Sequence, residues 1–136
     1  MAFDFGLRQI GIATGNTRTG TSSALTVIKA RDGIPNWDAV ANLIGEWQPN
    51  QLVVGLPLNM DDSHSELAAL AQKFGRRLEG RFGLPVAFVD ERLSSKEAKT
   101  LLKEQGHAGD YQTQPADDLA AQLILNTWLQ SFSSND

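Results

Sequence analysis

The chain contains 136 residues, the size of one ordinary domain, so we expect a single domain over residues 1–136. Hydrophobic residues make up 41% and charged residues 21% of the sequence, a globular balance that argues against a disordered or fibrous protein. Twelve basic and sixteen acidic residues give a net charge of −4, so nucleic-acid binding would need a local basic patch or bound cations.

The sequence contains no cysteine, which excludes disulfides, thiolate zinc sites and cysteine nucleophiles. The longest uninterrupted apolar stretch, residues 52–58, is much shorter than the roughly 20 residues of a membrane-spanning helix. Asp4 interrupts the apolar start of the chain, which does not fit a secretory signal. We therefore expect a cytoplasmic protein that does not bind membranes.

The first third of the chain is predicted to form three closely spaced strands, paired as an antiparallel meander. These strands are short and β-prone, and they cover Ala2–Phe5, Ile10–Ala13 and Leu25–Ile28. A helix is expected next, because apolar residues recur at helical spacing between Trp37 and Trp47. Asn36 is placed to cap the start of this helix, and Pro49 closes the segment after its end.

In the second half of the chain, buried strands alternate with helices. Leu52–Val54 and Val86–Val89 are apolar runs without alternation, typical of strands buried on both faces. Two helices are predicted from capping-box sequences, one from Ser63 to Gly80 or Gly83 and one from Ser94 to Gly106. A last helix follows Pro115, and its expected inner residues are Leu119, Ala120, Leu123, Ile124 and Trp128.

The predicted element order is βββαβαβαα. Strand–helix–strand units require parallel pairing with right-handed crossovers, whereas the first three strands pair antiparallel. The fold class is therefore α/β, with a five-stranded mixed sheet and helices on both of its faces. Trp37, Trp47 and Trp128 fall at core spacing, so we expect them to pack in the interior.

Acidic residues stand on three separate elements. Asp4 lies in an apolar strand, where an ionised carboxylate is costly unless it is paired or binds a metal. The segment Asp90–Arg92 lies at the carboxyl end of a strand, and Asp117–Asp118 opens the last helix. Carboxylates without histidine or cysteine nearby suit Mg²⁺ or Mn²⁺. Each feature also has a structural explanation, because Asp117 or Asp118 can cap a helix and Asp90–Arg92 can form a surface ion pair.

Four blocks of sequence, taken in order, closely resemble the YqgF (RuvX) family. They are residues 4–11 (DFGLRQIG), 54–61 (VGLPLNMD), 90–94 (DERLS) and 117–121 (DDLAA). The family is described as Holliday-junction resolvases and is also assigned to pre-16S ribosomal RNA maturation. The resemblance implies an RNase H-like fold over essentially the whole chain.

The resemblance also implies a set of catalytic carboxylates. By motif, Asp4, Glu91 and Asp117 correspond to the family's acidic residues, which hold divalent metals, here Mg²⁺ or Mn²⁺, at the phosphodiester. Asp90 takes second place to Glu91, because neighbouring strand residues face opposite sides of a sheet. Arg92 either clamps a phosphate or holds Glu91 in place.

Basic residues cluster on one predicted helix face. Lys73, Arg76, Arg77 and Arg81 have the spacing of neighbours on a helix, and Arg8 lies in the turn after the first strand. Such a stripe is either a solvated helix face or a surface that contacts nucleic-acid phosphates.

The leading hypothesis is a metal-dependent endonuclease acting on structured RNA, with precursor ribosomal RNA as its substrate and ribosomal assembly particles as partners. One alternative keeps the chemistry and replaces the substrate with branched DNA, which requires a two-fold dimer. Another is a non-catalytic nucleic-acid-binding or ribosome-assembly factor. For the oligomeric state we expect a monomer or a weak homodimer.

Overall fold

The computed structural model of the chain describes residues 1–56, 66–90 and 117–133, with the side chains of the last helix described from residue 120 to 129. Within these ranges six strands form one mixed sheet, in the order β4-β3-β2-β1-β5-β6. The strands are β1 (Ala2–Asp4), β2 (Gln9–Asn16), β3 (Thr21–Arg31), β4 (Ile34–Pro35), β5 (Leu52–Leu56) and β6 (Val86–Asp90). The helices are α1 (Trp37–Trp47), α2 (Glu66–Phe82) and α4 (Asp117–Ser133).

Strand pairing confirms both halves of the predicted sheet. β1 pairs antiparallel with β2, and β2 pairs antiparallel with β3. On its other side β1 runs parallel to β5, with Phe3 opposite Val54, and β5 runs parallel to β6, with Leu52 opposite Val86. The three parallel strands therefore end at the same edge of the sheet.

The predicted count of five strands was wrong by one. The additional strand, β4, consists of Ile34 and Pro35 paired with the end of β3. Gly33, at φ +82°, forms the turn between the two strands. A strand of two residues is too short to show a hydrophobic period, so the sequence pattern contained no signal for it.

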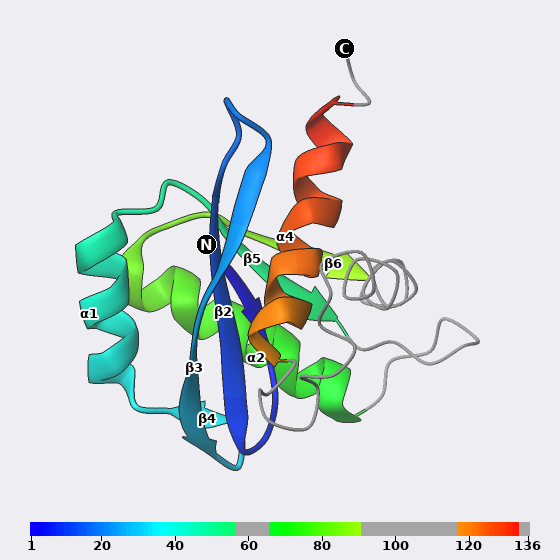
Figure 1. The fold of residues 1–136 in the computed structure, drawn as a ribbon. Helices are drawn as coiled ribbons and strands as arrows, with labels where there is room; N and C mark the ends of the chain where they lie inside the picture. The colour runs from blue at the N-terminus through cyan, green and yellow to red at the C-terminus, as the bar shows by residue number, and fades with distance from the viewer. Residues whose placement is uncertain (57–65, 91–116, 134–136) are drawn as a thin grey trace, which may run out of the picture.

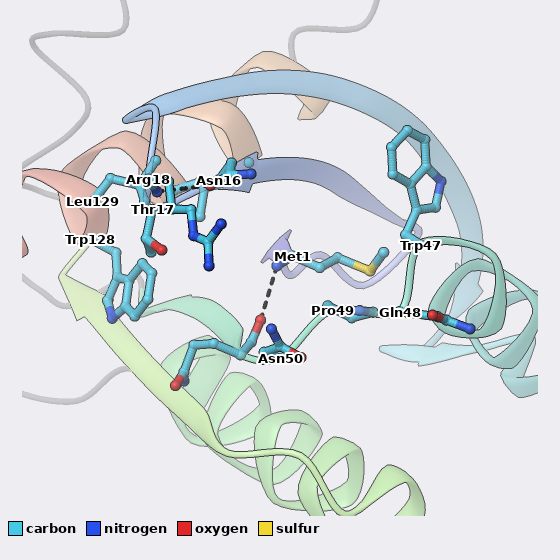
Figure 2. Close-up of a pocket in the computed structure, with 13 residues that line it drawn as sticks. Met1, Asn16, Thr17, Arg18, Trp47, Gln48, Pro49, Asn50, Trp128 and Leu129 are labelled. Atoms are coloured by element: carbon cyan, nitrogen blue, oxygen red, sulfur yellow. Dashed lines mark hydrogen bonds between the residues drawn. The ribbon is translucent and has the colours of Figure 1, made fainter.

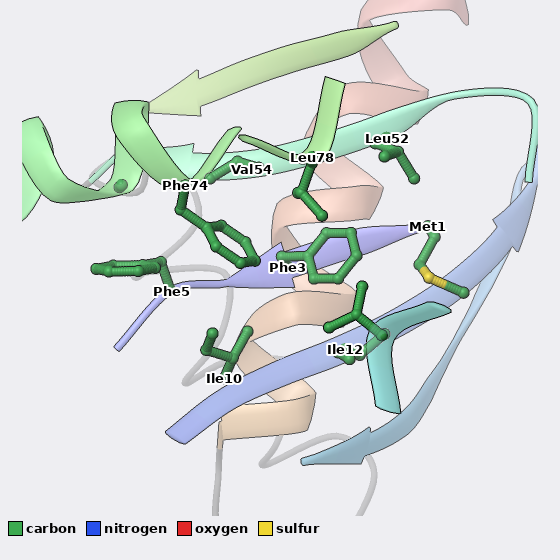
Figure 3. Packing of buried hydrophobic residues seen from close by; sticks show 11 residues of the cluster. Met1, Phe3, Phe5, Ile10, Ile12, Leu52, Val54, Phe74 and Leu78 are labelled. Atoms are coloured by element: carbon green, nitrogen blue, oxygen red, sulfur yellow. The ribbon is translucent and has the colours of Figure 1, made fainter. Parts of the chain in front are cut away.

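Helices cover both faces of the sheet, as predicted, with α4 on one face and α1 and α2 on the other (Figure 1). On the α1/α2 face, Phe3 of β1 packs edge-on against Phe74 of α2, with ring centroids 5.6 Å apart (Figure 3). On the α4 face, small residues such as Ala2 and Val53 pack against α4. Side chains of β1 thus alternate between two separate cores.

Local signals explain where two of the helices begin and end. The Asn36 Oδ1 accepts a hydrogen bond from the Asp38 N–H at 3.0 Å, which confirms the predicted cap of α1. Of the two glycines proposed to end α2, Gly83 does so, at φ +66°, and its N–H donates to the Glu79 carbonyl. The capping box at Ser63 and the helix predicted from Ser94 to Gly106 lie outside the described residues.

Two of the three tryptophans, Trp37 and Trp128, are partly buried and pack against a core as predicted. Trp37 stacks on Phe74, with ring centroids 5.8 Å apart. Trp47, the last residue of α1, is 47% exposed, so its prediction was wrong. Trp128 flanks the α4 core and also lines a hollow at the surface. Helical spacing identified the face of each tryptophan but not whether a neighbouring element covers it.

Candidate functional site

The carboxyl edge of the parallel strands brings together two of the predicted acidic positions. Asp4 is the last residue of β1 and Asp90 is the last residue of β6, with β5 between them. Helix α4 runs toward the same edge, since Leu129 lies beside Met1 at the opposite edge and Asp117 begins the helix about 18 Å earlier. The start of α4 is therefore directed to the edge that carries Asp4.

Asp4 and Asp90 belong to opposite faces of the sheet. Asp4 and Ala2 are two residues apart in β1, so their side chains lie on the same face of the sheet. The Ala2 side chain packs in the α4 core, and the Asp4 carboxylate therefore lies on the α4 face. Asp90 and Phe88 are two residues apart in β6, so they share a face of the sheet, and Phe88 lies against Gly75 of α2. Asp90 is consequently on the α2 face.

Glycines flank Asp4 on both neighbouring strands. Asp4 pairs directly with Gly11 of β2. The parallel register that places Phe3 opposite Val54 continues to Gly55 of β5 beside Asp4. Residues paired across a sheet share a face, so neither neighbouring strand places a side chain beside this carboxylate. The two glycines were not identified from the sequence, because their position beside Asp4 depends on the pairing register.

A hollow of about 550 Å³ opens at the end of β1. Its lining consists of the turn after the strand and one residue of α2: Asp4, Phe5, Gly6, Leu7, Arg8, Gln9 and Leu67. A side chain at position 6 would approach the Gln9 carbonyl oxygen to 2.5 Å, so this tight turn requires glycine. The Leu7 and Arg8 carbonyls accept hydrogen bonds from Gly33 and Ala30, which hold the turn against the β3–β4 hairpin. The predicted site residues Asp4 and Arg8 therefore line one hollow.

The basic residues of α2 extend away from this hollow. Leu67 lines it, Lys73 follows about 9 Å further along the helix, and Arg81 about 21 Å further. Lys73, Arg76 and Arg81 are exposed, and Arg77 is half-buried. Arg81 also lies over the ring of Trp37, 4.3 Å from its centroid, which fixes one end of the stripe.

The remaining predicted site residues are not placed. Glu91 and Arg92 lie outside the described residues, as do the side chains of Asp117 and Asp118. Among the side chains that the structure does describe, no three acidic or histidine groups lie close enough to hold a metal ion. No helix in the described ranges is long and apolar enough to cross a membrane.

Comparison with known proteins gives a match over nearly the whole chain. Residues 1–131 match the family model described as "RuvX: Holliday junction resolvase". A protein of Saccharophagus degradans is 52% identical over 128 residues, which cover 94% of this chain and 90% of that protein. One of Chromohalobacter salexigens is 52% identical over 136 residues, covering 100% of this chain and 89% of the relative. Both relatives are named "Putative pre-16S rRNA nuclease".

Two solved structures share the fold at low sequence identity. Thermus thermophilus RuvC in complex with a Holliday junction substrate aligns with a TM-score of 0.58 at 15% identity, over 96% of this chain and 92% of the other. The Fowlpox virus resolvase in complex with Holliday junction DNA aligns with a TM-score of 0.56 at 14% identity, over 96% of this chain and 95% of the other. These likenesses confirm the predicted RNase H-like α/β fold.

Proposed function

The chain belongs to the RuvX family of nucleases, and from this premise we propose that it is a metal-dependent endonuclease in the 5′-end maturation of pre-16S ribosomal RNA. The observation that carries the substrate assignment is the 52% identity, over nearly the full length of both chains, to relatives with that name. The descriptions of the family as a resolvase and of the relatives as nucleases favour an enzyme over the non-catalytic alternative. We place the reaction in the cytoplasm, on ribosomal assembly particles, with the protein as a monomer or weak homodimer.

The proposed catalytic carboxylates are Asp4, Glu91 and Asp117. Three observations support Asp4: it ends β1 at the edge shared by the parallel strands, it faces α4, and glycines flank it on both neighbouring strands. Glu91 follows Asp90 directly, and Asp90 ends β6 at the same edge as Asp4. Asp117 begins the helix that runs toward this edge.

This set of residues fits a hard divalent cation. All three side chains offer oxygen atoms, which Mg²⁺ and Mn²⁺ prefer, and the glycines beside Asp4 leave the neighbouring strand positions without side chains. When bound, the metal would lower the pKa of a water molecule and offset the charge of the scissile phosphate. Asp4, Glu91 and Asp117 would hold the metal, and Asp90, on the α2 face, would at most have a supporting role.

Basic side chains would hold the substrate backbone. Arg8 lines the same hollow as Asp4, so it is placed to meet a phosphate next to the cleaved bond. Lys73, Arg76, Arg77 and Arg81 would contact phosphates farther along the strand, independently of base sequence. For Arg92 two roles remain open, a phosphate clamp or a support for Glu91. These contacts would let a protein of net charge −4 accept a polyanion locally.

A second candidate substrate is branched DNA, which the description of the family favours. A junction resolvase cuts two strands symmetrically and requires a two-fold arrangement of two active sites. A protein that stays monomeric on a four-way junction would not meet that requirement.

Parallel cleavage assays test the proposal. Wild-type protein, Asp4→Asn and the exposed control Asp38→Asn are incubated with precursor ribosomal RNA and with a four-way DNA junction, in Mg²⁺ and in Mn²⁺. We expect metal-dependent cleavage of the RNA by the wild type and the control, and none by Asp4→Asn. Wild-type activity of Asp4→Asn would refute the site, and cleavage of the junction alone would move the assignment to DNA.

The pair Asp117→Asn and Asp118→Asn tests the third carboxylate. Residues one apart on a helix point about 100° away from each other, so only one of the two is expected to reach the metal. Asn and Asp cap helices about equally well, so both variants should remain stable. We expect Asp117→Asn to reduce the single-turnover rate far more than Asp118→Asn, and the reverse order would shift the site by one residue.

A further inference from the structure

A second hollow, of about 370 Å³, lies at the edge of the sheet opposite Asp4 (Figure 2). β1 begins there and β2 ends there, so the length of β2, about 24 Å, separates it from the turn at the candidate site. The lining residues come from the β2–β3 turn, the end of α1, the chain before β5 and the second half of α4. Segments far apart in sequence therefore build one concave surface.

Two tryptophans bound this hollow. Trp47 ends α1 and is 47% exposed, and Trp128 belongs to α4. Figure 2 shows them on opposite sides of the hollow, with Met1 between them. An exposed tryptophan at a concave surface offers a flat apolar ring, against which another planar ring can stack.

Arg18 is the charged side chain of the hollow. The Asn16 Oδ1 accepts a hydrogen bond from the Arg18 N–H at 2.8 Å, and the Gly20 N–H donates to the Asn16 carbonyl at 2.9 Å. These bonds, with Gly20 at φ +66°, fix the tight turn that presents Arg18. In Figure 2 the Arg18 side chain reaches into the space between Trp128 and Met1.

The rest of the lining combines apolar and amide side chains and contains no acidic residue among the described positions. The side-chain amides of Gln48 and Asn50 offer both donors and acceptors. Asn16 Oδ1 already accepts from the Arg18 N–H, and Gln51 Nε2 donates to the Leu52 and Pro85 carbonyls. None of the described lining residues is an aspartate or glutamate, although acidic residues outnumber basic ones in the whole chain. A hollow with aromatic rings, an arginine and amides, and no carboxylate side chain in its described lining, has the chemistry to bind a ligand that combines a planar ring with a negative charge.

We propose that this hollow binds one nucleotide of a single-stranded segment of nucleic acid, with the base against the exposed ring of Trp47 and a phosphate at Arg18. The identity of that strand as part of the RNA substrate rests on the function proposed above. The hollow lies about 24 Å from the candidate site, so the bound nucleotide would be outside the bond that is cut. Its role is to hold an unpaired flank of the substrate.

Binding measurements in EDTA, where metal-dependent cleavage is suppressed, test the proposal. The probe is a fluorescently labelled single-stranded RNA of ten nucleotides, compared with the same DNA sequence and with duplex RNA. Arg18→Gln and Trp47→Leu remove the two exposed contributions, and Arg31→Gln is a matched control on an exposed arginine outside the hollow. Thermal melts establish that each variant is folded.

We expect Arg18→Gln and Trp47→Leu each to weaken single-strand binding roughly tenfold, for RNA and DNA alike, with duplex binding and the control unchanged. Arg18→Gln should also lower the slope of log affinity against log salt by about 0.7, whereas Trp47→Leu should not. Single-strand affinities within twofold of wild type for both variants would overturn the proposal, as would an equal loss for the duplex.

The outcome is separable from that of the proposed nuclease function. Failure of the nuclease proposal would appear as wild-type cleavage by Asp4→Asn or as no cleavage at all, with the EDTA binding data unaffected. Failure of the nucleotide hollow would appear in the binding data of Arg18→Gln and Trp47→Leu, while the loss of cleavage in Asp4→Asn persists.

Discussion

The two faces of the sheet are built from side chains of very different size. The face covered by α1 and α2 contains the large aromatic rings Phe3, Phe5, Trp37 and Phe74. The strand residues of the face covered by α4 are small, namely Ala2, Ala13, Val53 and Val89. The α4 face also carries Asp4, between Gly11 and Gly55. One face thus contains the large aromatic rings, and the other has small side chains around the Asp4 carboxylate.

This difference predicts that stability and activity depend on opposite faces. Phe3→Ala removes a fully buried ring from the aromatic face and should lower the free energy of unfolding by about 3–5 kcal/mol. Asp4→Asn, on the other face, should abolish cleavage and leave the fold intact or slightly more stable without metal, because mutual repulsion of carboxylates is relieved. Chemical denaturation of both variants, with Leu70→Ala as a half-exposed control, measures the contrast.

A similar loss of stability in Val53→Ala would contradict the comparison, because that residue lies on the α4 face and its side chain is smaller. Adding Mg²⁺ sharpens the test. A metal that binds only the folded protein raises its melting temperature, and this rise should occur in Phe3→Ala and be absent in Asp4→Asn.

Filling the space beside Asp4 should damage activity without removing any functional group. Gly55→Val adds a side chain next to the Asp4 carboxylate on the α4 face. Displacing a catalytic group by about 1 Å can cost roughly 100-fold in rate, and we expect a loss of that order in single-turnover cleavage. Gly45→Val is the control, because a Cβ at Gly45 meets nothing within 4 Å.

The smaller substitution Gly55→Ala should give an intermediate rate. If Gly55→Val retained the wild-type rate, the space beside Asp4 would have no part in the site.

The amino end of β1 predicts a pH dependence of stability. Burial lowers the pKa of the Met1 amine from 8.0 to about 6, while its N–H donates to the Gln51 carbonyl at 3.0 Å. Between pH 6 and 8 the unfolded chain therefore binds more protons than the folded one, so the free energy of unfolding rises with pH. For residues 1–136 with a free amine, we expect an increase on the order of 1 kcal/mol between pH 6 and 8.

Urea denaturation at several pH values measures this increase. The same chain with an acetylated Met1 is the control, because it has no titrating amine and should lack this part of the pH dependence. Equal pH profiles for the free and acetylated chains would show that the amine is not desolvated.

The smallest expected effect concerns the basic face of α2. Replacing Arg76 and Arg77 with glutamine should weaken binding about equally for all substrates and lower the salt slope by about 0.7 to 0.9 for each lost phosphate contact. The chemical step at saturating substrate should barely change, since these residues would position the backbone. Lys29→Gln with Arg31→Gln removes the same charge elsewhere, and an unchanged salt slope in the α2 variant would make its stripe a solvated face.

Hydrophobic spacing and helix-capping residues in the sequence were sufficient to predict most of the fold. The meander, the parallel strands β5 and β6 and α1 with its Asn36 cap follow from patterns within a few residues. The predicted burial of both strands holds for β5 but not for β6, where Phe88 is 40% exposed. Asp4 could be singled out for the same reason, since a carboxylate within an apolar strand is unfavourable wherever the strand is buried. These preferences arise within a few residues of the chain, so they do not depend on which distant segment packs against the strand or helix.

Features that depend on contacts between distant segments could not be predicted. Of the predicted inner residues of α4, Leu123 and Ile124 are buried and Trp128 packs against the core, but the prediction missed Ala121, Leu125 and Leu129, which join Ile124 against the sheet. Strand register placed the glycines beside Asp4, and the meeting of α1, α4 and the β2–β3 turn formed the tryptophan hollow. Several helix faces and strand registers have similar local free energies, and contacts between distant segments determine which of them occurs. The buried face of α4, the register beside Asp4 and the tryptophan hollow therefore exist only in the assembled fold.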